Sequence, residues 1–124
     1  MSTVPWPTEI KLAPGKRMLT IGFDDGTRFE LSAELLRVCS PSAEVQGHGV
    51  DQRKTVGGKR NVTIMGVEPV GNYAVRLRFD DGHDTGLFSW AYLRELGQGA
   101  DQRFRSYVAE LKMKGLNRDQ SGEK

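Results

Sequence analysis

The sequence is poor in the side chains that bind metals or attack substrates. It holds one cysteine, Cys39, and two histidines, His48 and His83, among 124 residues. A lone cysteine cannot form an internal disulfide, which fits a reducing compartment. A non-haem iron triad needs two histidines and a carboxylate, so it would use both histidines of the chain. We therefore expect no metal, no other cofactor and no catalytic residue.

Long apolar runs and a strong excess of one charge are also missing. No run of eighteen apolar residues occurs, and the first residues lack the basic and then apolar pattern of a secretory signal. We therefore expect a cytoplasmic protein without a membrane contact. The net charge of +2 argues against a nucleic-acid partner, because such proteins usually carry a concentrated basic face. Length and composition fit one globular domain, expected over residues 1–115.

The most informative feature that is present is an internal repeat. The motif Phe-Asp-Asp-Gly at 23–26 returns 56 positions later at 79–82. Each copy leads through a serine, Ser32 or Ser89, to a Leu-Arg pair at 36–37 or 93–94. We interpret the chain as two copies of one supersecondary unit.

Each copy is typical of a strand, a tight turn, a second strand and a short helix. Apolar and polar residues alternate before both motifs, which is the period of a half-buried strand. Asp-Gly predicts the turn, because Gly26 and Gly82 can take a positive φ without steric cost. Ser32 and Ser89 predict the N-caps of the helices that follow.

The remaining segments complete the expected fold. Residues 8–12 predict an edge strand, 61–67 a second strand with a bulge at Gly66, and 69–72 a turn. Helical spacing of apolar residues predicts the longest helix between a cap at Asp101 and a stop at Gly115. Residues 116–124 are expected to form a disordered tail.

These elements predict an α+β fold. It consists of an antiparallel sheet built from two strand-turn-strand-helix units, with helices packed on one face, and a C-terminal helix.

The connection between the two copies, from Val38 to Arg60, is unusually long for a compact domain. Its part 46–60 holds four glycines, and four basic residues against the single acid Asp51. Stability gives no reason for this length, so we expect the loop to bind a partner. The candidate partner-binding residues are His48, Arg53, Lys54, Lys59, Arg60, His83 and Trp90.

Four features have plainer explanations than chemistry. The aspartates beside His83 recur in the first copy without a histidine, so the turn itself explains them. Cys39 has no histidine near it in sequence and fits a structural thiol better than a nucleophile. The run 56–60 lacks the spacing of a phosphate loop. Trp90 is more typical of a core or rim aromatic than of a base-stacking platform.

Taken together, several segments resemble the gamma-butyrobetaine hydroxylase-like N-terminal domain, over residues 6–96. They are the two Asp-Gly turns, Leu-Leu-Arg at 35–37, Ser-Pro-Ser-Ala-Glu-Val at 40–45, Gly-His-Gly at 47–49, Gly-Asn-Tyr-Ala-Val at 71–75, and Ser89-Trp90 with Leu93. The resemblance implies a small α+β module. The iron and 2-oxoglutarate site of the hydroxylases belongs to a separate catalytic domain, so their activity is not implied.

The resemblance also concerns zinc. Related modules place a Cys-Pro-Cys-x-x-Cys run after the Leu-Arg pair and a distant histidine in the second turn. Here Ser40, Ser42 and Val45 stand at the cysteine positions, and His83 alone matches a ligand. One imidazole cannot hold a structural zinc ion, which needs four ligands.

Three functions remain open. The first, which we favour, is a non-catalytic interaction module that binds an unidentified protein or a second copy of itself. It would use residues 38–60 and the helix that begins after Ser89. The second is an accessory factor for metal or iron-sulfur proteins, with transient use of Cys39, His48 and His83. The third is a weak nucleic-acid or anion binder that uses the basic loop 46–60.

Overall fold

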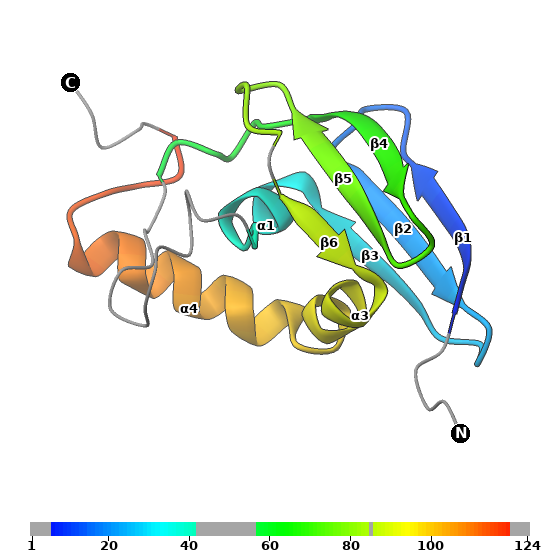
Figure 1. Ribbon diagram of the computed structural model, residues 1–124. Coiled ribbons are helices and arrows are strands. Elements are labelled where there is room, and N and C mark those ends of the chain that lie inside the picture. The colour runs from blue at the N-terminus through cyan, green and yellow to red at the C-terminus, as the bar shows by residue number, and fades with distance from the viewer. Residues whose placement is uncertain (1–5, 42–56, 85, 120–124) are drawn as a thin grey trace.

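The computed structural model describes residues 6–41, 57–84 and 86–119. The helices and strands are, in order, β1 (Pro7–Leu12), β2 (Met18–Phe23), β3 (Arg28–Ser32), α1 (Ala33–Val38), β4 (Ile64–Val70), β5 (Ala74–Phe79), β6 (Leu87–Ser89), α3 (Trp90–Gln98) and α4 (Ala100–Met113) (Figure 1). Two consecutive units of three strands and one helix are followed by α4. The predicted α+β class and C-terminal helix are confirmed.

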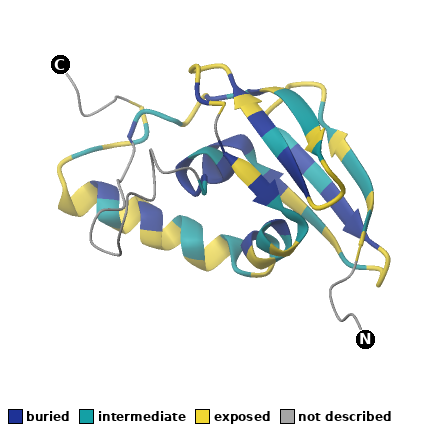
Figure 2. Cartoon of the chain, viewed as in Figure 1, coloured by how far each residue is buried: buried dark blue, intermediate teal, exposed yellow. Residues whose placement is uncertain are grey.

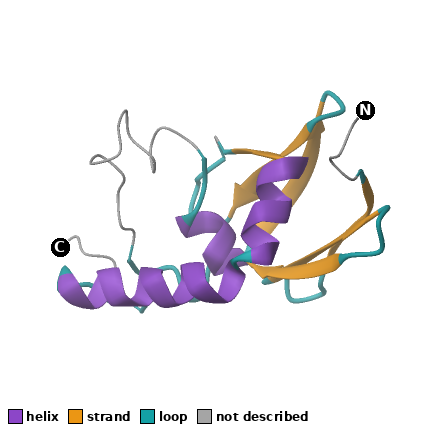
Figure 3. Cartoon of the chain, turned by 90° about the horizontal axis from the view of Figure 1, so that it is seen from below, coloured by secondary structure: helices purple, strands orange, loops and turns teal. Residues whose placement is uncertain are grey.

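The strands form two separate antiparallel sheets, β1-β2-β3 and β4-β5-β6, where one sheet was expected. Each unit therefore has one strand more than the repeat predicted, because β1 and β4 join the strands around the turns. Both β1 and β4 carry a register shift near their start, and the one between Ile64 and Gly66 confirms the bulge expected at Gly66. The helices gather on one side of the strands (Figure 3).

The two Asp-Gly turns have the same geometry. Gly26 and Gly82 have φ values of 89° and 90°. The amide of Phe23 donates to the carbonyl of Thr27, and that of Phe79 to the carbonyl of His83, both at 2.9 Å. The predicted hairpin turns and their glycines are confirmed.

The helix starts are confirmed in the repeat and shifted in α4. Oγ of Ser32 accepts the amide of Leu35, and Oγ of Ser89 accepts the amide of Tyr92. Helix α4 begins at Ala100 after Gly99, without a side-chain cap, so Asp101 lies in its first turn instead of capping it. Gly115, with φ of 72°, follows the end of α4 as expected.

Strand β4 starts and ends three residues later than the sequence predicted. Pro69 and Val70, expected in a turn, pair with Val75 and Ala74 and lengthen the hairpin. Proline is tolerated there because β4 is an outer strand and needs no amide on its free side. The turn shrinks to the residues around Gly71, which has φ of 55°.

One core connects the sheets and helices. Its fully buried large side chains come from both units: Leu19, Ile21, Leu31, Leu36, Ile64, Val75, Leu77, Phe88, Leu93 and Leu96. Helix α4 adds Tyr107 and Leu111 from one face and exposes much of the remainder (Figure 2). No helix in the described ranges has the length and apolar character needed to cross a membrane.

Candidate interaction site

The two units hold each other through a reciprocal pair of Arg–Asp contacts. Arg94 of α3 donates from Nη2 to Asp25 Oδ2 in the first turn at 2.6 Å. Arg37 of α1 donates from Nε to Asp81 Oδ2 in the second turn at 2.8 Å. Both arginines follow the leucine of their repeat, and both aspartates precede the glycine. Each helix therefore contacts the turn of the other unit, and the two contacts are equivalent in sequence position.

The two units also pack closely against each other at matching positions. A Cβ placed on Gly97 of α3 would lie 2.3 Å from the ring of Phe29 in β3. A Cβ placed on Gly86 would lie 2.3 Å from Oγ of Ser40, which follows α1. Positions 29 and 86, and positions 40 and 97, correspond in the two units. The glycine in α3 thus lets the end of this helix approach β3. The glycine before β6 lets the start of this strand approach the segment that follows α1.

The symmetry is broken where Thr27 of the first turn corresponds to His83 of the second. Thr27 Oγ1 accepts a hydrogen bond from Arg94 Nη1 at 2.8 Å, so this guanidinium is held at two points. Arg37 Nη1 is buried and has no hydrogen-bond partner among the residues that the structure describes. An imidazole in place of the threonine hydroxyl explains the difference, because His83 points its Nε2 to Ser40 instead.

A second difference is Lys59, which donates to Asp81 Oδ2 next to Arg37. Oδ1 of Asp81 accepts the amide of His83 at 3.1 Å. Burial raises the pKa of Asp81, but the hydrogen bonds from Lys59 and the His83 amide and the charge of Arg37 outweigh it and lower the pKa to about 2. Asp81 is therefore ionised at neutral pH. We call Arg37, Ser40, Lys59, Asp81 and His83 the second-turn site.

His83 and Ser40 form the inner side of the second-turn site. Ser40 is fully buried and His83 is 5% exposed. A hydrogen bond of 2.9 Å joins Ser40 Oγ and His83 Nε2, and the His83 ring also packs near Phe79. The pair therefore links the segment after α1 to the second turn.

This pair occupies two of the positions that the family resemblance associates with zinc, and its chemistry does not fit that ion. A serine hydroxyl is not among the usual donors of structural zinc sites. Two ligands of one zinc ion lie roughly 3.3 Å or more apart, whereas these atoms are 2.9 Å apart and bond to each other. Within the described ranges no three His, Cys, Asp or Glu side chains are grouped so that they could hold a metal ion.

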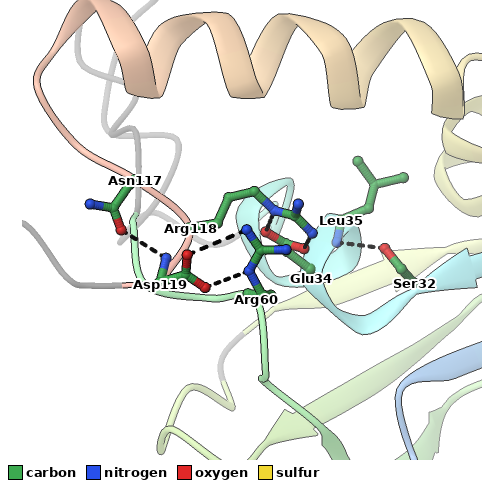
Figure 4. A network of polar contacts seen from close by, with 7 residues as sticks. All are labelled: Ser32, Glu34, Leu35, Arg60, Asn117, Arg118 and Asp119. Atoms are coloured by element: carbon green, nitrogen blue, oxygen red, sulfur yellow. Dashed lines mark hydrogen bonds and ion pairs between the residues drawn. The ribbon is translucent and has the colours of Figure 1, made fainter.

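Arg60 does not share the contact of Lys59 with Asp81. It contacts the segment that follows α4. It pairs with Asp119 (Figure 4). Its amide also donates to the carbonyl of Arg118. Arg118 in turn makes two hydrogen bonds, at 2.8 and 2.6 Å, to the buried carboxylate of Glu34 in α1. Residues 117–119, which belong to the expected tail 116–124, therefore make specific contacts.

Trp90 lies apart from the second-turn site. Its Nε1 donates to the carbonyl of Asn72 at 2.9 Å, and Asn72 precedes β5 whereas Asp81 follows it. The indole borders a groove of about 640 Å³ between β1 and β4, which Ile10 and Val67 also line. The structure thus brings together Lys59 and His83 among the candidates, and separates Arg60 and Trp90 from them.

Three candidate residues, His48, Arg53 and Lys54, lie outside the described residues. The sequence reasoning missed Arg37 and Ser40 as members of the site. The repeat held a signal for Arg37, because an aspartate and an arginine recur at matching positions in both copies. Nothing in the local sequence indicated that these charges would pair between the copies. The contact of Ser40 depends on the same long-range pairing.

Fold and site together define a small α+β module made of two interlocked units. The chain belongs to the gamma-butyrobetaine hydroxylase-like N-terminal family, whose model matches residues 10–94. The resemblance seen in the sequence is therefore confirmed. No curated protein matches the chain.

The chain is also similar to solved structures. Two protein structures determined in solution by NMR are 47% and 49% identical to this chain, with TM-scores of 0.82 and 0.81. The alignments cover 98% of this chain and 97% of the first protein, and 95% of this chain and 88% of the second. A crystal structure from Acidithiobacillus ferrooxidans ATCC 23270 is 37% identical with a TM-score of 0.63, and covers 78% of this chain and 98% of its own. That protein is described as one of unknown function in the DUF971 family.

Proposed function

We propose that this chain is a non-catalytic interaction module that binds a protein partner at the second-turn site and the adjoining connection between its two units. The observation that carries the proposal is the departure of the second unit from the first. Features shared by both turns are explained by the fold that they share. Lys59 and His83 are found at the second turn, as is an Arg37 Nη1 without a hydrogen-bond partner among the described residues. The first turn is complete without counterparts.

The position of the connection supports the same surface. Val38–Pro41 lead from α1 into it and contain Ser40, whereas Gly57–Arg60 lead out of it and contain Lys59. Both ends therefore meet at Asp81 and His83. The basic residues Arg53 and Lys54 belong to the same connection in sequence. The ends of this connection at the second-turn site therefore support a partner surface that continues along the connection.

The test is affinity enrichment from native lysate at moderate salt, with quantitative mass spectrometry of the recovered proteins. The variant replaces Arg53, Lys54 and Lys59 by serine. A charge-matched control replaces Lys11, Lys16 and Lys112 by serine. These lysines lie in β1, in the turn after β1 and in α4. We expect the variant to lose at least about tenfold of a partner that the control retains, since each charged contact contributes about 1.5 kcal/mol or more.

Equal recovery by the variant and the control contradicts the proposal. Nuclease treatment of the lysate separates the alternative in which nucleic acid is the ligand. Light scattering of the purified chain separates self-association from binding of another protein. Both proteins must first show the same thermal midpoint, so that loss of the fold is not read as loss of binding.

A further inference from the structure

We infer that the second-turn site binds an oxyanion, a carboxylate or phosphate group of its partner, through Lys59 with the charge of Arg37 behind it. This inference rests on the proposed function and names the chemistry of the group recognised there. It is carried by the charges of the second-turn site and by their difference from those of the first turn.

The first observation is a charge imbalance. Asp81 is the common partner of Arg37 and Lys59, and both donate to the same oxygen, Oδ2. The other oxygen is already used by the amide of His83. Within the part of the chain that the structure describes, one carboxylate thus contacts two cations. The Arg37 and Lys59 side chains are 12% and 17% exposed, so water screens their excess charge less than at an open surface.

The first unit shows what the fold alone requires. There one cation, Arg94, meets Asp25, and its second donor reaches Thr27. In the second unit the corresponding donor, Arg37 Nη1, has no acceptor within the described part of the chain. A buried donor without an acceptor costs about 1–3 kcal/mol, so the guanidinium of Arg37 is incompletely neutralised behind Lys59.

Two neighbouring charges act in the opposite direction. Asp80 and Asp84 flank Asp81 in the turn and both are exposed. Asp80 is partly engaged, because its Oδ1 accepts the amide of Thr63. Water screens these carboxylates, so they weaken binding without preventing it. We therefore expect an isolated anion to bind with a Kd of about 1–10 mM, and tighter binding when the anion belongs to a larger partner.

The experiment is an NMR titration of the full chain with inorganic phosphate, at an ionic strength held constant with sodium chloride. We expect the Nε–Hε signal of Arg37 and the amide of Lys59 to shift and saturate. The Nε–Hε signal of Arg94 is the internal control and should stay in place. Lys59→Ala should weaken binding about tenfold, whereas Lys112→Ala, on the exposed side of α4, should not.

A parallel titration with acetate distinguishes the source of the oxyanion. Saturation by phosphate alone assigns a phosphate group, saturation by acetate alone assigns a carboxylate, and either supports the inference. Three results overturn it: no saturable shift with either anion, equal shifts at Arg37 and Arg94, or no effect of Lys59→Ala in a protein that keeps its dispersed spectrum.

The outcomes also separate this inference from the proposed function. If neither anion binds but the basic-residue variant still loses the protein partner, the oxyanion site is wrong and the interaction module stands. If an anion binds at Lys59 while partner recovery is unchanged, the oxyanion site stands and the proposed function is wrong.

Discussion

At the scale of single residues, glycine and aspartate at the two turns determine how the units meet. Gly26 and Gly82 have positive φ, and an added Cβ would meet no atom within 4 Å at either position. Their requirement is therefore one of backbone conformation and not of space. Asp25 and Asp81 use one oxygen for their own turn and the other for an arginine of the other unit.

The first prediction concerns the turn glycines. Gly26→Val and Gly82→Val should each lower the free energy of unfolding by more than about 1 kcal/mol, because a β-branched residue is strained at positive φ. Gly15→Val is the matched control, since Gly15 is also unhindered but has no positive φ. Denaturant midpoints measure the effect. Midpoints for the turn variants that equal the control would refute the backbone requirement.

The second prediction concerns acid. The pKa of Asp81 is lowered to about 2 from an ordinary value of 3.8, despite the opposing effect of burial. Hydrogen bonds from Thr27 and Arg94 also lower the pKa of Asp25. The folded state thus favours both carboxylates, and their stabilisation is full above about pH 4 and lost as the pH falls towards 2.

Urea unfolding at a series of pH values tests this linkage. Asp81→Asn should show a flatter loss of stability between about pH 4 and pH 2 than the unaltered protein, with the contribution of Asp25 remaining. Parallel curves for the two proteins would show that Asp81 is not linked to folding in this range.

At the scale of elements, the segment after α4 fastens the long helix to α1 and to the residues before β4. Arg118 binds Glu34, whose side chain is 6% exposed, and stacks on the ring of Phe104. Arg60 and Asp119 form a more open pair (Figure 4). The amide of Gly58 also donates to the carbonyl of Asn117 at 2.9 Å.

The third prediction compares these two ion pairs. Arg118→Ala should destabilise the protein by about 2–4 kcal/mol, because it leaves the buried carboxylate of Glu34 without its bidentate partner. Arg60→Ala should cost less than about 1 kcal/mol, as is typical of exposed pairs. Thermal and chemical unfolding of both variants give the comparison. A larger cost for Arg60→Ala would contradict the placement of the segment.

The elements that could be predicted from the sequence are those fixed by local chemistry. Alternation of apolar residues, Asp-Gly turns and serine caps act within a few residues, so β2, β5, both turns and the starts of α1 and α3 were predicted. The ends of β4 were wrong because pairing with Val75 and Ala74 draws Pro69 and Val70 into the strand. The start of α4 was wrong because Gly99 both ends α3 and precedes α4.

The candidate site could be predicted in part for the same reason. Lys59 and His83 stood out by composition and by the difference between the repeats. The other residues of the site are distant in sequence. Arg37 is 44 positions from its partner Asp81, and Ser40 is 43 positions from its partner His83. Contacts of that range depend on how the two units pack, which no local pattern encodes.

At the scale of the whole molecule, polar contacts in both directions join the two units. Each supplies an arginine to the turn of the other, and Tyr92 of α3 donates its hydroxyl proton to the carbonyl of Cys39 after α1. The amide of Ile64 in β4 also donates to Lys16 in the first unit. Each unit therefore relies on the other for part of its polar contacts.

The fourth prediction follows from this dependence. The chain has one tryptophan in each unit, Trp6 beside the first turn and Trp90 at the start of α3. Trp6→Phe and Trp90→Phe leave a single fluorophore in one unit at a time. Fluorescence midpoints in denaturant should coincide with the midpoint from circular dichroism in both variants. Separate midpoints for the two fluorophores would show that the units unfold independently.

The central claim is that function lies where the second unit departs from the first. Amide hydrogen exchange of the chain, with and without the partner recovered by enrichment, tests it most directly. The account predicts slower exchange at residues 37–41, 57–60 and 80–84 on binding, and unchanged exchange at the equivalent first turn, residues 24–28. Protection confined to the first turn, or to the groove between β1 and β4, would contradict it.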